Sequence, residues 1–222
     1  MTSPISERIT TIRASLPPSV RLIAISKQVS AEVIRSAYAA GIRDFGENRI
    51  QDAASKQAEL HDLSDITWHF IGHLQSNKAK KAIELFQWIH SVDNLKLAQR
   101  LNQLAQELGV HPQVCLQVKI LPDPNKSGWS VSELLADLSA LNQCKTLQIQ
   151  GLMTIPPLGL NDAANFSVFN STFQLAKEIN EQNWSHIKIQ QLSMGMSGDY
   201  QLAVQAGATM VRLGTILFGE RT

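Results

Sequence analysis

The chain has 222 residues, of which 44% are hydrophobic and 18% are charged, a balance that excludes a disordered protein. Its formal net charge of +1, with acidic and basic residues interspersed, gives no electrostatic footprint for nucleic acid or for an anionic membrane surface. The first twenty residues lack the continuous apolar region of a signal peptide, and no run approaches membrane-spanning length. We therefore expect a cytoplasmic protein with neither a nucleic-acid partner nor a membrane partner.

Short β-rich runs alternate with amphipathic helical segments along the chain. A helix is expected around residues 4–15, and further helical patterns include residues 30–40, 94–108 and 163–182. The strand-like runs span residues 21–26, 42–46, 67–72, 88–92, 113–120, 147–152, 187–193 and 209–214.

This alternation implies parallel strands, and about eight of them in a chain of this length favour an α/β fold, a closed (β/α)8 TIM-type barrel. Only eight residues, TILFGERT, follow the last strand, so we expect a short final helix and an N-terminal helix that covers part of the shell. The segment PDPNKSG, residues 122–128, is expected to form a loop after the fifth strand. No linker-like tract divides the chain, which predicts a single barrel domain over residues 1–222 without a second domain.

Lys27 follows the first strand-like run, RLIAIS, on the face that carries Ile23 and Ile25. A lone lysine in such a position more often lies past the strand end and reaches solvent. In a barrel of this class, however, the carboxyl ends of the strands carry the active site. A lysine held there between an apolar strand and a loop is partly desolvated, which favours the neutral amine that attacks a carbonyl to form a Schiff base.

Two glycine-containing loops, SMGMSGD and LGTILFG, follow the seventh and eighth strands, and each opens a helix. Ser197 and Gly198 stand at one helical start, and Gly214 and Thr215 at the other, where free N–H groups and the helix dipole attract anions. Glycine and serine also begin many helices as ordinary caps, so either loop alone is a weak signal. As a pair after strands seven and eight, they predict a phosphate site.

Arg212 lies near the end of the eighth strand, which becomes the neighbour of the first strand when the barrel closes. Arg212 and Lys27 could then contact different edges of one small aromatic ring. An arginine at a barrel mouth is otherwise a structural ion-pair partner. The carbonyl-seeking lysine, the ring-facing arginine and the two phosphate loops together describe a site for pyridoxal 5′-phosphate.

Seven motifs along nearly the whole chain carry a resemblance that is specific in order and spacing. They are AISK at 24–27, FGENRIQ at 45–51, WHFIGHLQSNK at 68–78, SVD at 91–93, GLMTI at 151–155, LSMGMSGD at 192–199 and VRLGTILFG at 211–219. The set resembles the pyridoxal phosphate homeostasis protein family (YggS/PROSC type). This resemblance implies a barrel similar to the N-terminal domain of bacterial alanine racemase.

The resemblance also implies how the cofactor is held: as an aldimine of Lys27, with Asn48 at its polar edge and Arg212 at the pyridine nitrogen. The full set of implied cofactor-binding residues is Lys27, Asn48, Met196, Ser197, Arg212, Gly214 and Thr215. The implied function is a monomeric carrier or regulator of pyridoxal 5′-phosphate in intracellular vitamin B6 homeostasis, with apo-enzymes as possible acceptors.

No robust catalytic activity is expected, and no catalytic residue is assigned. An arginine facing the ring nitrogen stays protonated and does not readily give the ring a proton, so the cofactor is a weakened electron sink. Racemases with this barrel also rely on a second domain and a dimer to complete the site. Two alternatives remain open: a racemase-like pyridoxal phosphate enzyme, and a cofactor-free aldolase in which Lys27 forms a Schiff base with a sugar phosphate.

Other polar residues have no assigned role. His69 and His73 lie four residues apart around a strand end, which offers no metal-binding face, and we expect no metal site. His90 stands at another strand end and could approach the cofactor, while Tyr200 comes just after the SGD sequence. Lys119 replaces the asparagine that is frequent in the family at this strand, so the resemblance implies no role for it.

Overall fold

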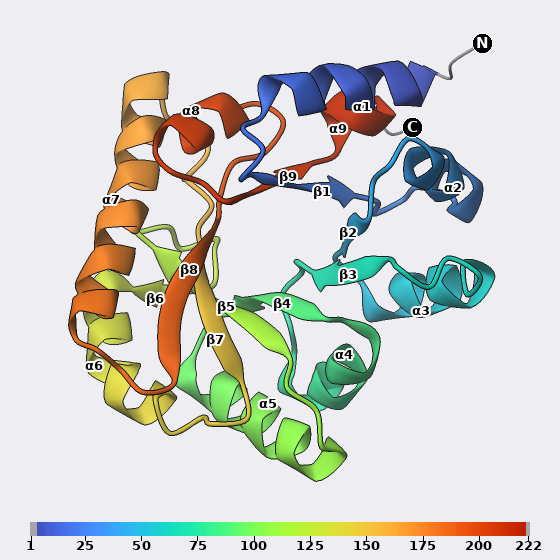
Figure 1. Cartoon of the computed structure of the whole chain (residues 1–222). Coiled ribbons are helices and arrows are strands. Elements are labelled where there is room, and N and C mark those ends of the chain that lie inside the picture. Colours follow the sequence, from blue (N-terminus) through green and yellow to red (C-terminus); the bar gives the residue numbers. More distant parts are fainter. Residues whose placement is uncertain (1–3, 221–222) are drawn as a thin grey trace.

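The computed structural model describes residues 4–220, which form a closed barrel of parallel strands surrounded by helices (Figure 1). In chain order the strands are β1 (Arg21–Ile25), β2 (Asp44–Glu47), β3 (Thr67–Phe70), β4 (Trp88–Val92), β5 (Gln113–Lys119), β6 (Trp129–Ser130), β7 (Gln148–Met153), β8 (Ile187–Ser193) and β9 (Met210–Leu213). All except β6 belong to the ring, which closes where β9 pairs with β1 and β4 with β5. The predicted eight-stranded barrel is thus confirmed.

Helices form the outer layer of the barrel (Figure 1). They are α1 (Pro4–Ser15), α2 (Ala31–Ala39), α3 (Ile50–Glu59), α4 (Ala79–Leu85), α5 (Leu95–Leu108), α6 (Val131–Leu141), α7 (Asp162–Glu181), α8 (Tyr200–Gln205) and α9 (Thr215–Phe218), with a 3₁₀ turn, η1 (Ser76–Lys78), before α4. The expected N-terminal helix is α1, which packs against α2 and the four-residue final helix α9. Within residues 4–220, no helix has both the length and the apolar character needed to cross a bilayer.

Several shell helices begin at a polar residue whose side chain accepts a backbone N–H of the first turn. Ser30, Asn94, Ser130 and Asn161 cap α2, α5, α6 and α7 in this way. At Ser130 the side chain of Glu133 returns a bond to the Ser130 backbone N–H, completing a capping box. These caps place each helix start immediately after the loop that follows a strand.

The apolar core has two parts, separated by the strands. Leu22 and Ala24 of β1 belong to the larger cluster, which lies between the strands and the helices. Ile23 and Ile25 belong to a smaller cluster inside the barrel, where they meet Trp88 and other buried side chains. The period-two alternation expected for the first strand is therefore present. Ile23 and Ile25 lie on the inward face of β1, the face that Lys27 continues.

Six of the eight predicted strands differ from the structure by one or two residues at one or both ends, and one short strand was missed. The second strand begins at Asp44 and not at residue 42, because the Ile42 N–H is already bonded to the Ala37 carbonyl at the end of α2. The short strand β6 was not predicted, since two residues carry no recognisable alternation. Residues 122–128 form the expected loop after β5, and residues 221–222 of the TILFGERT segment lie outside the described residues.

Candidate functional site

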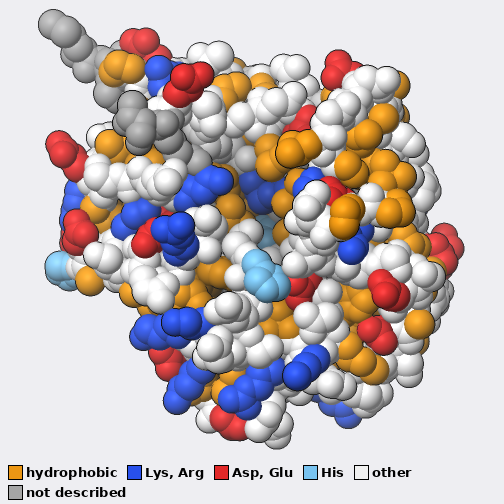
Figure 2. Space-filling model, turned by 180° about the vertical axis from the view of Figure 1, so that it is seen from behind, with side chains coloured by type: hydrophobic (Ala, Val, Ile, Leu, Met, Phe, Trp, Pro, Cys, Tyr) orange, Lys and Arg blue, Asp and Glu red, His pale blue; other side chains and the backbone are white. Residues whose placement is uncertain are grey.

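A cavity of about 420 Å³ opens at the carboxyl ends of the strands. All of the sequence-predicted site residues line it: Lys27, Asn48, Met196, Ser197, Arg212, Gly214 and Thr215. The cavity is also lined by Gly198, which the sequence placed at the predicted phosphate site, and by residues to which no role was assigned from sequence: Ile25, Ile71, Gly72, Met153 and Ile155. Figure 2 shows a face that is hollowed near its middle, with lysine, arginine and histidine side chains around the hollow.

A larger hollow of about 770 Å³ lies at the other end of the barrel, beside the first residues of β7 and β8. The amino-terminal ends of strands in this fold class carry no active site, whereas the carboxyl ends do. We therefore assign the functional site to the smaller cavity, where the lysine, the arginine and the two glycine-containing loops meet.

The backbone just before Lys27 is held by a buried polar cluster. The Ser26 N–H donates to the Gly46 carbonyl at 3.0 Å, and its hydroxyl donates to Oε1 of Glu47 at 2.6 Å. Lys56 bridges the same two residues, with its Nζ 2.8 Å from the Ser26 carbonyl and 2.7 Å from Glu47 Oε1. Glu47 is fully buried, and its ion pair with Lys56 offsets the cost of that burial. This cluster fixes the point from which Lys27 reaches the cavity.

Arg212 lines the cavity and is 5% exposed. Its Nη1 donates to the Ser193 carbonyl at 2.5 Å and to the Ser193 hydroxyl at 2.8 Å, and its Nη2 donates to the Thr154 carbonyl at 3.1 Å. Among residues 4–220, its Nε–H has no acceptor. Burial lowers the pKa of Arg212 to about 10, an effect that Asp199 and Cys115 oppose, so the guanidinium stays protonated at neutral pH.

The two glycine-containing loops lie against each other. The Ser197 hydroxyl accepts the N–H groups of Gly214 and Ile216 at 3.3 and 3.4 Å, which joins the loop after β8 to the start of α9. The N–H groups of Ser197, Gly198 and Thr215 find no acceptor among the described residues. Both α8 and α9 are short, with six and four residues, so these free donors contribute more to anion binding than the expected helix dipoles do.

Known proteins resemble this chain over nearly its whole length. Residues 2–222 match the family model described as alanine racemase, N-terminal domain. The pyridoxal phosphate homeostasis protein of Synechocystis sp. is 55% identical over 210 residues, which cover 95% of each chain. The protein of that name from Pseudomonas aeruginosa is 46% identical over 206 residues, 92% of this chain and 86% of its own. The chain belongs to the pyridoxal phosphate homeostasis protein family.

Solved structures place the same fold in this family. The structure of PipY from Synechococcus elongatus PCC7942 with PLP bound has a TM-score of 0.93 and 54% sequence identity, covering 97% of this chain and all of that chain. An alanine racemase of Clostridium difficile has a TM-score of 0.77 at 16% identity and covers 98% of this chain but 56% of its own. At that identity, the racemase likeness shows the fold alone.

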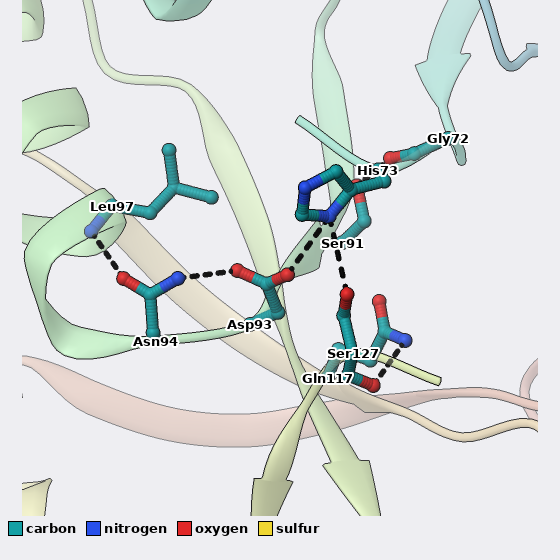
Figure 3. Close-up of polar contacts among 8 residues, drawn as sticks. All are labelled: Gly72, His73, Ser91, Asp93, Asn94, Leu97, Gln117 and Ser127. Carbon is teal, nitrogen blue, oxygen red and sulfur yellow. Dashed lines mark hydrogen bonds and ion pairs between the residues drawn. The ribbon is translucent and has the colours of Figure 1, made fainter. Parts of the chain in front are cut away.

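His73 stands on the rim of the cavity, next to Gly72, and its side chain is 61% exposed (Figure 3). Its Nδ1 lies 3.1 Å from Oδ2 of Asp93 and 3.2 Å from the Ser127 hydroxyl. His69 is instead fully buried inside the barrel, so the two histidines do not face each other. No cluster of three or more potential metal ligands forms among residues 4–220.

The residues whose roles stayed open from sequence lie outside the cavity. His90 is fully buried and reaches the Ser193 hydroxyl with its Nδ1 at 2.7 Å, so it contacts Arg212 only through that serine. Tyr200 is buried against α1, with its hydroxyl 3.4 Å from that of Ser15. Lys119 lines a separate hollow beside α6.

The Gly72→Ala variant is expected to lose about 1–3 kcal/mol of unfolding free energy, the usual cost of overpacking. A Cβ at Gly72 would lie 2.2 Å from the backbone oxygen of Asn48, so the two loops must move apart at the cavity wall. Gly198→Ala is the matched control, because a Cβ there meets no described atom within 4 Å. Urea denaturation of both variants measures the difference; equal stability would contradict the close packing of these loops.

Unfolding free energy is expected to fall as the pH drops below about 6.5, the ordinary pKa of histidine. Burial lowers the pKa of His69 and His90 in the folded chain, so below this pH the unfolded chain binds protons that the folded chain does not. Above it both states are uncharged at these residues, and their contribution to the pH dependence vanishes. Each histidine adds up to about 1.4 kcal/mol per pH unit to the slope.

Denaturation at pH 7 and at mildly acidic pH measures this slope. His90→Gln should flatten it, whereas His186→Gln, which replaces an exposed histidine, should leave it unchanged. A slope that is the same in all three proteins would show that the buried histidines do not cause the acid sensitivity.

Proposed function

We propose that this chain binds pyridoxal 5′-phosphate, retains it through a covalent bond to the Lys27 amine, and serves as an intracellular carrier or regulator of the cofactor. The observation that carries the proposal is the convergence of Lys27, Arg212 and the two loops on one cavity. The PLP-bound structure of PipY, at 54% identity, supports it. We also propose that the chain acts in the cytoplasm as a monomer built from one barrel domain.

The residues present fit this cofactor. The cavity of about 420 Å³ lies within the usual range for small-ligand sites. Lys27 offers a primary amine for the aldehyde, and Ile25, Met153 and Ile155 supply apolar contacts for a ring. The free N–H groups beside Ser197 and Thr215 offer donors for a phosphate. When bound, the cofactor supplies an aldehyde and an electron-withdrawing ring.

The site supports a carrier better than a catalyst. Arg212 remains protonated and is held by three hydrogen bonds, so it donates to a ring nitrogen and keeps that nitrogen free of its own proton. A racemase-like enzyme also needs a second acid or base across the substrate. No tyrosine or histidine lines the cavity within the described part of the chain.

The purified chain, loaded with pyridoxal 5′-phosphate, is expected to activate an apo-aminotransferase while turning over L-alanine far more slowly than about 1 per second, the low end of ordinary enzymes. Aminotransferase activity after mixing measures transfer, and chiral chromatography measures racemisation. The same transfer assay with free cofactor at matched concentration is the control. Turnover at the ordinary enzyme rate would favour the racemase-like alternative. Failure to bind the cofactor, with cleavage of a sugar phosphate, would favour the aldolase.

A further inference from the structure

A chain of hydrogen bonds crosses the barrel interior, beginning at Arg212 beneath the cavity. The Arg212 Nη1 lies 2.8 Å from the Ser193 hydroxyl, which lies 2.7 Å from Nδ1 of His90. The Nε2 of His90 lies 2.9 Å from Nδ1 of His69, and the Nε2 of His69 lies 2.9 Å from Oδ1 of Asp44. The five residues come from β9, β8, β4, β3 and β2, so these hydrogen bonds form only in the closed barrel.

The two ends of this chain lie in different surroundings. Ser193, His90 and His69 are fully buried, and Arg212 faces the cavity at the carboxyl ends of the strands. Asp44 is the first residue of β2, at the opposite end, and its side chain is 21% exposed. The row of hydrogen bonds therefore connects the candidate cofactor site with the opposite end of the barrel.

The two end groups determine the direction of every bond between them. A guanidinium only donates hydrogen bonds, and an ionised carboxylate only accepts them. The Ser193 hydroxyl must then accept from Arg212 and donate to His90. His90 must carry its proton on Nε2 and donate it to Nδ1 of His69. His69 must likewise carry its proton on Nε2 and donate it to Asp44. Burial lowers the pKa of both histidines, which agrees with two neutral rings.

We propose that Asp44 is a positioning residue for the cofactor site. Acting through His69, His90 and Ser193, it enforces the one proton arrangement in which the Ser193 hydroxyl donates to His90 while it accepts from Arg212, and so holds the remaining N–H groups of Arg212 toward the cavity. Without the carboxylate, the donor and acceptor of each hydrogen bond between Asp44 and Ser193 can exchange roles, and His90 then donates to Ser193. The Ser193 oxygen would then accept from both His90 and Arg212, and its own proton would lose the His90 acceptor, so Arg212 would share a weaker acceptor in a buried site. This inference rests on the proposed function, in which Arg212 contacts the ring nitrogen.

The first test uses the protein without ligand. Asp44→Asn keeps the shape of the side chain but offers both a donor and an acceptor, so it permits both directions. Nitrogen NMR of histidine-labelled protein is expected to show only the Nε2-protonated tautomer of His69 and His90 in the native chain, and a mixture of tautomers in the variant. Single replacements of the two histidines assign their signals. An unchanged single tautomer in Asp44→Asn would overturn the proposal.

Arg21→Gln is the matched control. Arg21 lies 3.8 Å from Asp44 and stacks over the Trp88 ring, yet it takes no part in the chain of bonds. Its replacement removes the neighbouring charge while leaving the carboxylate in place. The control should therefore retain the single tautomer of both histidines; a mixture in the control would assign the effect to surface charge and overturn the role of the carboxylate.

The second test compares pyridoxal 5′-phosphate with an analogue in which C–H replaces the ring nitrogen. The native chain should prefer the natural ring, and Asp44→Asn should reduce that preference by about threefold to tenfold, the equivalent of one hydrogen bond. Arg21→Gln should keep the preference. A purely structural role for Asp44 would weaken both ligands equally, which would overturn the inference.

Arg212→Leu separates this inference from the proposed function. If Arg212→Leu abolishes the preference while Asp44→Asn retains it in full, the contact of Arg212 with the ring stands and the role of Asp44 is wrong. If the native chain binds both ligands equally, the contact of Arg212 with the ring nitrogen fails, and the positioning role fails with it. If the native protein binds neither ligand, the proposed function fails. The tautomer measurement still decides whether Asp44 sets the donor–acceptor direction of the hydrogen bonds.

Discussion

The Lys27→Ala variant is expected to lose covalent capture of pyridoxal 5′-phosphate completely while keeping weaker, noncovalent affinity. The amine of Lys27 is the group proposed to bond the aldehyde, whereas Arg212 and the loop N–H groups remain in place to hold the ring and the phosphate. The bonds of the polar cluster formed by Ser26, Glu47 and Lys56 do not involve the Lys27 side chain, so the variant should fold normally.

Borohydride reduction followed by peptide mass analysis measures this loss. The native protein should carry the reduced cofactor on Lys27, and its yellow colour should disappear on reduction. Lys119→Ala is the matched control, because Lys119 lines a different hollow and its removal should change nothing. An unchanged visible spectrum in Lys27→Ala would remove Lys27 from the proposed role.

The double variant Ser197→Ala/Thr215→Ala is expected to weaken pyridoxal 5′-phosphate by roughly 100-fold and unphosphorylated pyridoxal far less. Hydrogen bonds to a charged group are the strong ones, and the variant removes two hydroxyl donors from the loops. It also removes the Ser197 oxygen that accepts the N–H groups of Gly214 and Ile216 and joins the two loops. Both effects act where the phosphate is proposed to bind.

Titration calorimetry with the two ligands measures the discrimination. Ser127→Ala provides a control on the same mouth, since Ser127 contacts His73 on the rim and does not line the cavity. We expect that control to bind both ligands as the native chain does. Equal losses for pyridoxal and its phosphate in the double variant would place the phosphate site elsewhere.

The sequence by itself was sufficient to predict the barrel and part of the cavity wall, including Lys27 and Arg212. Short-range sequence patterns are enough to predict these features. Period-two burial places Ile23 and Ile25 on the strand face that leads to Lys27, and glycine-containing loops mark the ends of β8 and β9. Carboxyl ends of parallel strands meet at one mouth, so residues just after separate strands converge there. Gly72, Met153 and Ile155 lie in quoted motifs and share this position, the signal by which they could have been found.

The closed tertiary structure alone decided what lies beneath the cavity. His90 and Ser193 are 103 positions apart and meet only because the ring of strands closes, and Asp44 gains its link to Arg212 in the same way. The sequence around a histidine in an apolar run does not show whether its ring will contact a serine, a carboxylate or a second imidazole in the folded protein. That choice depends on strand register and barrel closure, which pair Ile23 with Arg212 across β1 and β9 and are properties of the whole ring, not of any one segment.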